Sequence, residues 1–314
     1  MRNSQQHSST RFDVAGTGFT VLDQIYSDGV LADEALGGSC ANVLVSLAML
    51  QRHVAPVLRL GADAEGGKLV DEFVQAGAMV EYIFRDTETR SPVLTEVVDR
   101  LTSEHHFSFK CPITDRNHPR YQPIGWHEHE RAKSAFAGCA VFYADRLSPS
   151  ILDAMQVASA SGAIVVFEPS EIDDFSLFAE AMECVTILKV SSDRLDGDNA
   201  VMHSIDPSII RIVTHGVAGL EVRDRTKSFW CEPAPAPVMR DACGSGDMVS
   251  VGLIDWMLSS STSCEQLSAE TILDGVIAGQ RLAAENCGFL GARGLFRTKG
   301  ASFARSILDD ARRR

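Results

Sequence analysis

Short apolar runs alternate with amphipathic stretches along most of the chain. The first run, FDVAGTG at 12–18, has the length of a buried strand and ends at glycines. The next stretch, 40–50, places Val43, Leu47 and Leu50 on one face of a helix. The spacing therefore predicts a strand followed by a helix near the start of the chain.

The same alternation continues downstream. A strand is predicted at 54–61 and a helix at 66–78, where a glycine ends it. Helix-like segments such as 148–162 then separate four further β-rich runs, at 139–145, 163–170, 184–191 and 209–216. Repeated alternation predicts an α/β fold, in which a mostly parallel central sheet is flanked by helices on both faces. Ligands of such sheets bind beyond the carboxyl ends of the strands.

Residues 91–111 break this pattern. Apolar and polar residues alternate on both sides of DRLTSE at 99–104, which predicts a β-hairpin with one solvent-facing surface. A hairpin inserted early in a parallel sheet suggests a small β lid. Its apolar side chains could pack on their own domain or on a second copy of the chain; they are Val93, Val97, Phe107 and Phe109. The following segment, 114–130, is rich in proline and histidine and is expected to form a loop.

Composition narrows the function. A chain of 314 residues with 45% hydrophobic residues can bury one large α/β core. The formal net charge of −13 argues against a nucleic-acid partner, because phosphate contacts need a basic face. The 8 cysteines form no C-x-x-C pair, and no apolar run reaches the ~18 residues that span a bilayer. Since the N-terminus is polar and lacks a secretory signal, we expect a reduced, cytoplasmic protein without a membrane partner.

The glycine-rich stretch DACGSGD, at 241–247, is the main candidate for chemistry. A strand-like segment precedes it, and an apolar run with helical spacing follows it. Gly244, Ser245 and Gly246 therefore lie at a predicted helix N-terminus, where unpaired N–H groups favour an anion. Asp247 has two interpretations: a helix-capping carboxylate, or a base that takes a proton from a hydroxyl attacking a phosphoryl group. The local sequence alone favours the cap.

DACGSGD resembles the D-T-x-G-A-G-D signature of the PfkB, or ribokinase-like, family of carbohydrate kinases. Further segments resemble that family in the right order: GTGFTVLDQI at 16–25, LGGSCANVLVSLAML at 36–50, GADAEG at 61–66 and VTHGVAGLEV at 213–222. The resemblance covers roughly residues 12 to 300. It implies a ribokinase-like α/β fold with a small β-sheet lid over the substrate.

The resemblance also implies a domain organisation and a reaction. Residues 11–314 would form a single domain after a disordered lead of 1–10, with a lid contributed by about 18–37 and 91–111. The enzyme would be an ATP-dependent kinase of a sugar or sugar-like small molecule. It would transfer the γ-phosphoryl group in line to a hydroxyl of that acceptor. Many relatives dimerise through the lid, so a homodimer is a further expectation.

The site residues are carried over position by position. Asp247 would act as the base, and the N–H groups of Gly244, Ser245 and Gly246 would form the anion hole. The residues implied to bind the acceptor are Asp23, Gly38, Asn42 and Arg90. Those implied to bind ATP are Lys189, Thr214, Gly216, Gly219 and Gln280.

One family motif is altered. In the family an N-x-x-E motif organises Mg²⁺ through water, but the corresponding residues here are SSDR at 191–194. Glu168 or Asp193 would then supply the missing carboxylate, since Mg²⁺ keeps most of its waters when bound to a nucleotide. The segment 286–296 resembles the one beside the adenine and, in some members, a K⁺ site. The implied cofactors are thus ATP and Mg²⁺, with K⁺ an additional option.

Two alternatives to a sugar kinase stay open. A nucleoside kinase of the same family would use the same residues. A catalytically weak ligand-binding or regulatory protein would explain the altered metal motif, although such a protein would not need an intact Asp247 after the two glycines. The sequence does not identify the acceptor.

Other motifs carry weaker signals. GADAEGGK at 61–68 lacks the Gly-Lys-Ser/Thr ending of a P-loop, and GTG at 16–18 lacks the third glycine of a dinucleotide-binding fingerprint. HEHE at 127–130 suggests zinc only weakly, because no cysteine pair accompanies it. Cys243 lies at a predicted helix start that favours a thiolate, although a small packing residue is the simpler interpretation.

Overall fold

The computed structural model describes residues 12–27, 29–98, 105–194, 205–260 and 264–313. The predicted lead at 1–10 and the centre of the predicted hairpin at 99–104 lie outside these residues.

The large sheet has eight strands, in the order β14-β13-β12-β11-β10-β9-β1-β4. From β4 to β12 all neighbours are parallel, while β13 and β14 are antiparallel additions. The strands are β1 (Phe12–Thr17), β4 (Val54–Pro56), β9 (Cys139–Ala144), β10 (Ile164–Phe167), β11 (Ile187–Ser191), β12 (Ile210–Thr214), β13 (Leu220–Arg223) and β14 (Ser228–Cys231). The predicted mostly parallel sheet is confirmed.

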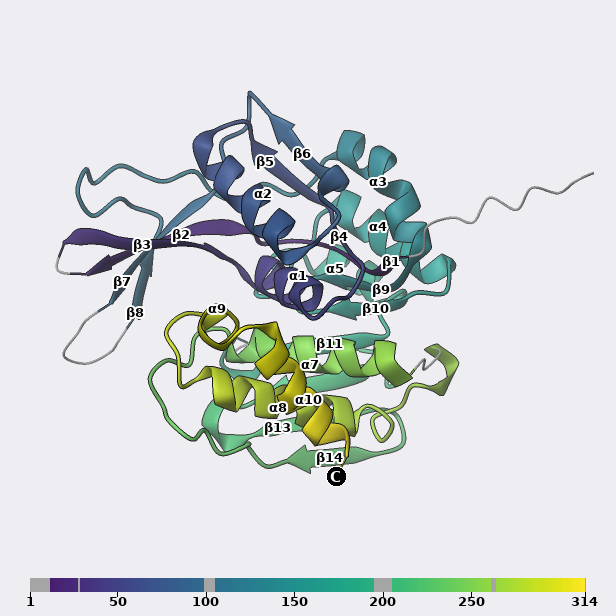
Figure 1. Ribbon diagram of the computed structural model, residues 1–314. Helices are drawn as coiled ribbons and strands as arrows, with labels where there is room; N and C mark the ends of the chain where they lie inside the picture. The colour runs from purple at the N-terminus through teal and green to yellow at the C-terminus, as the bar shows by residue number, and fades with distance from the viewer. Residues whose placement is uncertain (1–11, 28, 99–104, 195–204, 261–263, 314) are drawn as a thin grey trace, which may run out of the picture.

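Helices cover both faces of this sheet (Figure 1). One core contains α1 (Ser39–Met49), α2 (Ala64–Ala76), α7 (Ser245–Ser260), α8 (Leu273–Asn286), α9 (Gly294–Lys299) and α10 (Ala301–Arg312). The other core contains α3 (Trp126–Gly138), α4 (Pro149–Ala160) and α5 (Phe175–Met182). Successive strand residues alternate between the cores, as Val14 and Ala15 do, because side chains of a strand point to opposite faces.

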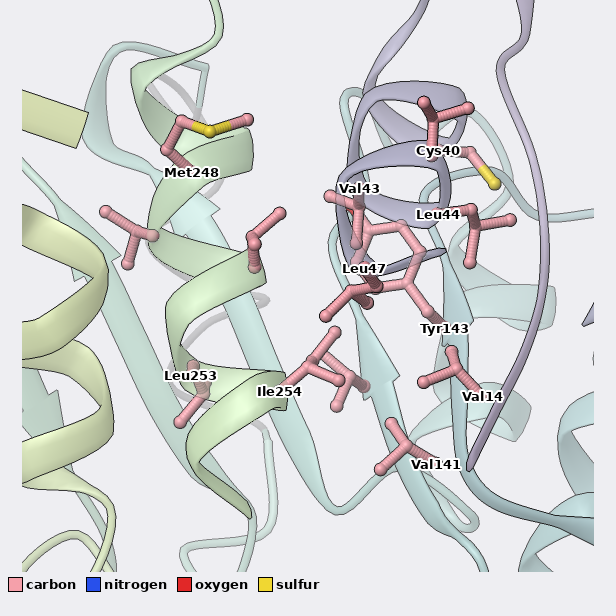
Figure 2. Close-up of a cluster of buried hydrophobic side chains, with 14 of the residues drawn as sticks. Val14, Cys40, Val43, Leu44, Leu47, Val141, Tyr143, Met248, Leu253 and Ile254 are labelled. Atoms are coloured by element: carbon pink, nitrogen blue, oxygen red, sulfur yellow. The ribbon is translucent and has the colours of Figure 1, made fainter. Parts of the chain in front are cut away.

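The first core brings α1 and α7 side by side. Figure 2 shows Leu47 of α1 pointing toward Ile254 of α7, with Val43 nearer the start of α1 and Tyr143 of the sheet beside them. All four side chains are fully buried. Because both helices begin at the same edge of the sheet, this packing fixes their N-termini relative to each other.

Two predicted strands and one predicted loop differ from the structure. The run at 54–61 is divided: β4 joins the large sheet, while β5 (Leu58–Gly61) pairs with β6 (Ile83–Asp86). The strand-like segment before DACGSGD is regular only in β14, since three prolines that follow cannot donate backbone hydrogen bonds. The predicted loop at 114–130 ends in helix, because α3 starts at Trp126, where the side chain of Glu128 accepts a hydrogen bond from Gly125 N.

A separate four-stranded sheet has the order β3-β2-β7-β8 and projects from one side of the molecule (Figure 1). It consists of β2 (Val21–Ser27), β3 (Val30–Gly37), β7 (Val93–Val98) and β8 (His105–Ser108). The antiparallel pair β7–β8 is the predicted hairpin, and β7 also pairs in parallel with β2. We call this four-stranded sheet the small sheet. Within the described residues, no helix is long and apolar enough to cross a bilayer.

Candidate active site

The DACGSGD loop is held in place from outside the helix that follows it. Asp241 accepts hydrogen bonds from Cys243 N at 2.8 Å and from Gly291 N at 2.6 Å. Gly244 has a φ of 71°, and a Cβ at this position would lie 2.5 Å from the Cβ of Ala292. Only glycine fits such a backbone this close to a neighbouring loop. Asp241 therefore stabilises the turn, which leaves Asp247 available for another role.

Asp247 lies in the first turn of α7 and faces α1. Its Oδ2 accepts a hydrogen bond from Asn42 Nδ2 at 2.8 Å, and the residue is 8% exposed. Burial raises the pKa of Asp247 to about 7, and the nearby charge of Glu168 adds to the rise. The bond from Asn42 and the charge of Lys189 act in the opposite direction. A carboxyl with a pKa near neutrality is suited to exchange a proton with a substrate.

A buried ion pair lies against the glycine loop. Lys189 of β11 pairs with Glu168, which follows β10, and the same carboxylate accepts bonds from Tyr143 Oη at 3.0 Å and Ser250 Oγ at 2.6 Å. A Cβ on Gly246 would lie 3.4 Å from Lys189 Nζ and 3.7 Å from a Glu168 oxygen. The pair is thus in direct reach of any group bound at the loop.

The small sheet contributes Asp23, a residue of β2. The carboxylate of Asp23 lies against Gly37, where a Cβ atom would overlap it. The next residue, Gly38, is the N-cap of α1. Burial raises the pKa of Asp23 to about 8, and Glu96 adds to the rise. The described residues offer no hydrogen-bond donor to Asp23 Oδ1 or to Asn42 Oδ1, although both atoms are buried. Two buried acceptors, one of them on the residue that bonds Asp247, are therefore unsatisfied, which is costly unless a ligand supplies donors.

Three of the expected nucleotide-binding residues, Thr214, Gly216 and Gly219, lie at the carboxyl end of β12, next to β11, which carries Lys189. Thr214 ends β12 and pairs with Ser191, the last residue of β11. Gly216 begins the short helix that follows and Gly219 caps its end, and both have positive φ values. Gln280 is buried on α8, which packs beside α7. This edge of the sheet is the one predicted to bind ligands.

Two expected residues lie apart from this arrangement. The Arg90 side chain is 69% exposed, and its Nε lies 3.4 Å from Asp63 Oδ2. Asp63 caps α2 by accepting a bond from Gly66 N, so Arg90 contacts a structural carboxylate. Asp193 is exposed and contacts its neighbour Ser192. Of the two carboxylates considered for the metal, Glu168 is the one beside the loop.

The weaker motifs have structural explanations. Burial and four surrounding carboxylates raise the pKa of Cys243, which disfavours a nucleophilic thiolate. HEHE opens α3, and His129 is buried with its Nε2 2.8 Å from Asp153. In the part of the chain that the structure describes, no three metal-ligand side chains cluster to hold an ion.

Sequence comparison supports the resemblance. The family model of the pfkB family carbohydrate kinases matches residues 33–294. The chain belongs to this family.

Solved structures of PfkB kinases share the fold at low identity. A fructokinase with bound ATP from Xylella fastidiosa has a TM-score of 0.74 at 20% identity, covering 95% of this chain and 98% of its own. A ribokinase from Arabidopsis thaliana complexed with ribose and ATP has a TM-score of 0.70 at 14% identity, covering 95% and 99%. A Burkholderia thailandensis nucleoside kinase in complex with inosine has a TM-score of 0.69 at 14% identity, covering 95% and 97%. A search of the curated proteins finds no significant match.

Two buried carboxylates of this PfkB chain, Asp145 and Glu96, were not predicted from the sequence. Asp145 accepts bonds from Phe19 N at 2.7 Å and Cys40 N at 3.1 Å, which ties the β1–β2 connection to the start of α1. Burial raises its pKa to about 6. The sequence signal for Asp145 was a carboxylate directly after a buried strand. No sequence signal marked Glu96, because its position relative to Asp23 depends on strand pairing.

Proposed function

We propose that this protein is an ATP-dependent kinase that phosphorylates a hydroxyl of a sugar or sugar-like small molecule. The observation that carries the proposal is Asp247: a buried carboxyl with a pKa of about 7, bonded to Asn42, in the first turn of a glycine-initiated helix. A capping residue would not need this environment. The ATP-bound and ribose-bound relatives support the choice of substrates.

In this mechanism Asp247 takes the proton of the acceptor hydroxyl as that oxygen attacks the γ-phosphorus in line, while the bond from the γ-phosphorus to the β–γ bridging oxygen breaks and ADP leaves. The N–H groups of Gly244 and Gly246, with the positive end of the α7 dipole, stabilise the charge on the transferred group. Ser245 contributes less, because its N–H donates to Ala242 O at 3.2 Å. Asp23 and Asn42 orient the acceptor with their unsatisfied oxygens.

ATP would occupy the edge formed by Lys189, Thr214, Gly216 and Gly219, with Gln280 of α8 as a further expected contact. Bound Mg²⁺ would neutralise phosphate charge. Glu168 fits the role of the missing motif carboxylate, because Tyr143 and Ser250 already orient it beside the loop. It would hold the ion through water, as Mg²⁺ prefers. K⁺ would be an additional cofactor at the segment 286–296, where backbone carbonyls would supply most of its ligands.

Two further expectations accompany the proposal. The eight free cysteines support a reducing, cytoplasmic location. Leu31 and Phe107 expose apolar surface on the small sheet, which supports a homodimer formed there. Arg90 stays the least supported acceptor contact, because Asp63 binds it.

Substitutions of Glu168 and Lys189, the two members of the ion pair beside the loop, should shift the pH profile of kcat/KM in opposite directions. Glu168→Gln removes a charge that raises the pKa of Asp247, so the rise in activity should move to lower pH by roughly one unit. Lys189→Met removes a charge that lowers the pKa of Asp247, so the rise in activity should move to higher pH. Tyr143→Phe keeps both charges and is the control. Shifts in the same direction would contradict the assignment.

The proposal is tested by ADP release with Mg·ATP over a panel of neutral sugars, amino sugars and nucleosides. We expect turnover of at least one sugar by the wild type. Turnover of nucleosides alone would favour a nucleoside kinase. Ligand-induced thermal shifts without turnover for any compound would favour the regulatory alternative.

A further inference from the structure

The end of β3, next to Gly37 and Gly38, is held from outside the small sheet. Because β3 is the edge strand of the described small sheet, the backbone groups on its outer side face no neighbouring strand. Leu36 N donates instead to Glu72 Oε1 of α2 at 2.7 Å, and Leu36 O accepts a hydrogen bond from Arg293 Nη2 at 3.1 Å. The same Nη2 donates to Glu72 Oε2 at 2.6 Å, which closes a ring of three residues. We call this ring the Arg293 clamp.

Arg293 is also joined to the DACGSGD loop through its own backbone. It directly follows Gly291 and Ala292. Gly291 N donates to Asp241 Oδ2 at 2.6 Å, and Ala292 packs so closely on Gly244 that a Cβ added there would overlap it. Three consecutive residues therefore connect the loop to the end of β3.

This connection is built from fixed groups. The Arg293 side chain is 4% exposed, and its bond to a carboxylate belongs to the stronger class of hydrogen bonds in proteins. The fully buried Asn286 holds the turn that precedes α9, since its Nδ2 donates to Ala292 O at 3.2 Å and its Oδ1 accepts from Leu295 N at 3.0 Å. The separation of Leu36 from the DACGSGD loop is thus set by buried contacts.

Both ends of the connection carry groups of the proposed reaction. Leu36 precedes Gly37, which lies against the Asp23 carboxylate. Gly38 follows and caps α1, the helix that carries Asn42. The other end is the DACGSGD loop, which would hold the transferred phosphoryl group. In-line transfer depends on how the acceptor is placed relative to that group, and an error of about 1 Å can lower the rate by about 100-fold.

We infer that Arg293 is a positioning residue: it fixes the acceptor-binding end of β3 relative to the DACGSGD loop, so that the acceptor hydroxyl and the γ-phosphoryl group are held in line. Arg293 acts through Leu36, Glu72 and the turn at Gly291, and takes no part in the proton transfer. The inference rests on the proposed function for the reaction and adds a residue that controls its geometry.

The first test is Arg293→Met, which removes the clamp and keeps a long apolar stem. With the sugar of highest turnover in the panel, we expect kcat to fall by about tenfold or more. KM for Mg·ATP and the release of ADP in the absence of acceptor should change little, because the clamp bonds α2 and the small sheet and not the β12 edge. A general loss of structure would change all three quantities, and an unchanged kcat overturns the inference.

Glu72→Ala separates position from charge. Arg293 lowers the pKa of Asp23 whereas Glu72 raises it, so loss of the two charges would act in opposite directions. Loss of position acts in one direction, so Glu72→Ala should also lower kcat by about tenfold, and the double variant should be no worse than Arg293→Met. Opposite effects of the single variants, or additive losses, would overturn the inference. Glu72 is 32% exposed, so this variant serves even if Arg293→Met does not fold.

Arg297→Met is the matched control. Arg297 of α9 bonds Asp33 of β3 at 2.8 Å, so it joins the same two elements, but the two side chains are 43% and 48% exposed. Exposed ion pairs of this kind contribute little. This variant should leave kcat unchanged. A loss equal to that of Arg293→Met would mean that any contact between α9 and β3 suffices, and the role of Arg293 would fall.

Amide hydrogen exchange tests the clamp without turnover. Arg293→Met should raise exchange by about tenfold in residues 35–38 and 241–247, since a hydrogen bond to a charged group has about that weight or more. Arg297→Met should raise it in neither segment. A response of Arg293→Met in only one segment, or in neither, overturns the inference.

These outcomes separate the inference from the kinase proposal. If no compound of the panel is turned over and both segments respond, the kinase proposal fails and the clamp stands. If the wild type is active and Arg293→Met keeps full kcat, the inference fails and the kinase proposal stands.

Discussion

Replacing Asp247 with asparagine should lower kcat by about 100- to 10,000-fold, the usual contribution of a positioned base. The amide keeps the shape of the side chain and can still bond Asn42, so KM for the acceptor should change little. In the wild type, kcat/KM should rise with pH through about 7, because only ionised Asp247 accepts the proton. Steady-state ADP release across pH 5 to 9 measures both effects.

The same substitution should stabilise the protein at alkaline pH. The pKa of Asp247 rises from 3.8 to about 7 on folding, so between these values the folded state binds a proton that the unfolded state has released. Stability therefore falls as pH rises through this window, by up to roughly 4 kcal/mol. Asp247→Asn removes that loss. Thermal unfolding should give similar Tm values for the two proteins below pH 4 and a higher Tm for the variant at pH 8.

These two results must occur together. A variant that loses activity and also loses stability at pH 8 would mean that Asp247 is a structural residue. A variant that keeps full phosphorylation would mean that another group accepts the proton. Asp241→Asn is the contrasting substitution, since Asp241 holds the turn through Cys243 N and Gly291 N and its change should lower the Tm.

The second large effect is on stability alone. Asp255 of α7 is fully buried and bonds Arg52 Nε at 2.7 Å, Arg305 Nη1 at 2.7 Å and Nη2 at 3.0 Å, and Arg312 Nη2. Burial would raise its pKa, but the bonds and charges of these arginines more than offset that effect. Asp255→Ala leaves three guanidinium groups without their common partner. We expect a loss of about 3–5 kcal/mol in the free energy of unfolding.

Urea denaturation measures this loss. The control is Asp309→Ala, since Asp309 is 41% exposed and bonds the same Arg312 at 3.3 Å. An exposed pair of this kind contributes no more than about 1 kcal/mol. Equal losses for the two variants would show that Asp255 does not hold α10 on α7.

Local patterns predicted the parts of the fold that depend on local physics. The parallel sheet follows from strand and helix periodicity, and α2 ends at Gly77 in the left-handed conformation that glycine favours. The run at 54–61 shows the limit: Val57 N bonds Gly16 O and separates two strands that belong to different sheets, a choice made by tertiary pairing.

The candidate site, like the fold, was predictable only where local sequence motifs mark its residues. Asp247 and Asn42 stand in recognisable motifs, and the structure joins them by a hydrogen bond. The neighbours that set the pKa of Asp247 come from other strands, so spacing along the chain does not reveal them. The direction of an exposed side chain such as Arg90 is not encoded by its neighbours in sequence, and here Asp63 decides it.

The pairing of β2 with β7 has a consequence for folding. These strands are adjacent in the small sheet, yet α1, β4, β5, α2 and β6 lie between them in the sequence. A contact between such distant segments carries a large loop-closure entropy, which the intervening elements reduce once they have packed. The small sheet should therefore assemble late, after α1 has docked on the main core. In newly made chains the proposed acceptor-binding surface would therefore form only after α7, which packs against α1, has been synthesised.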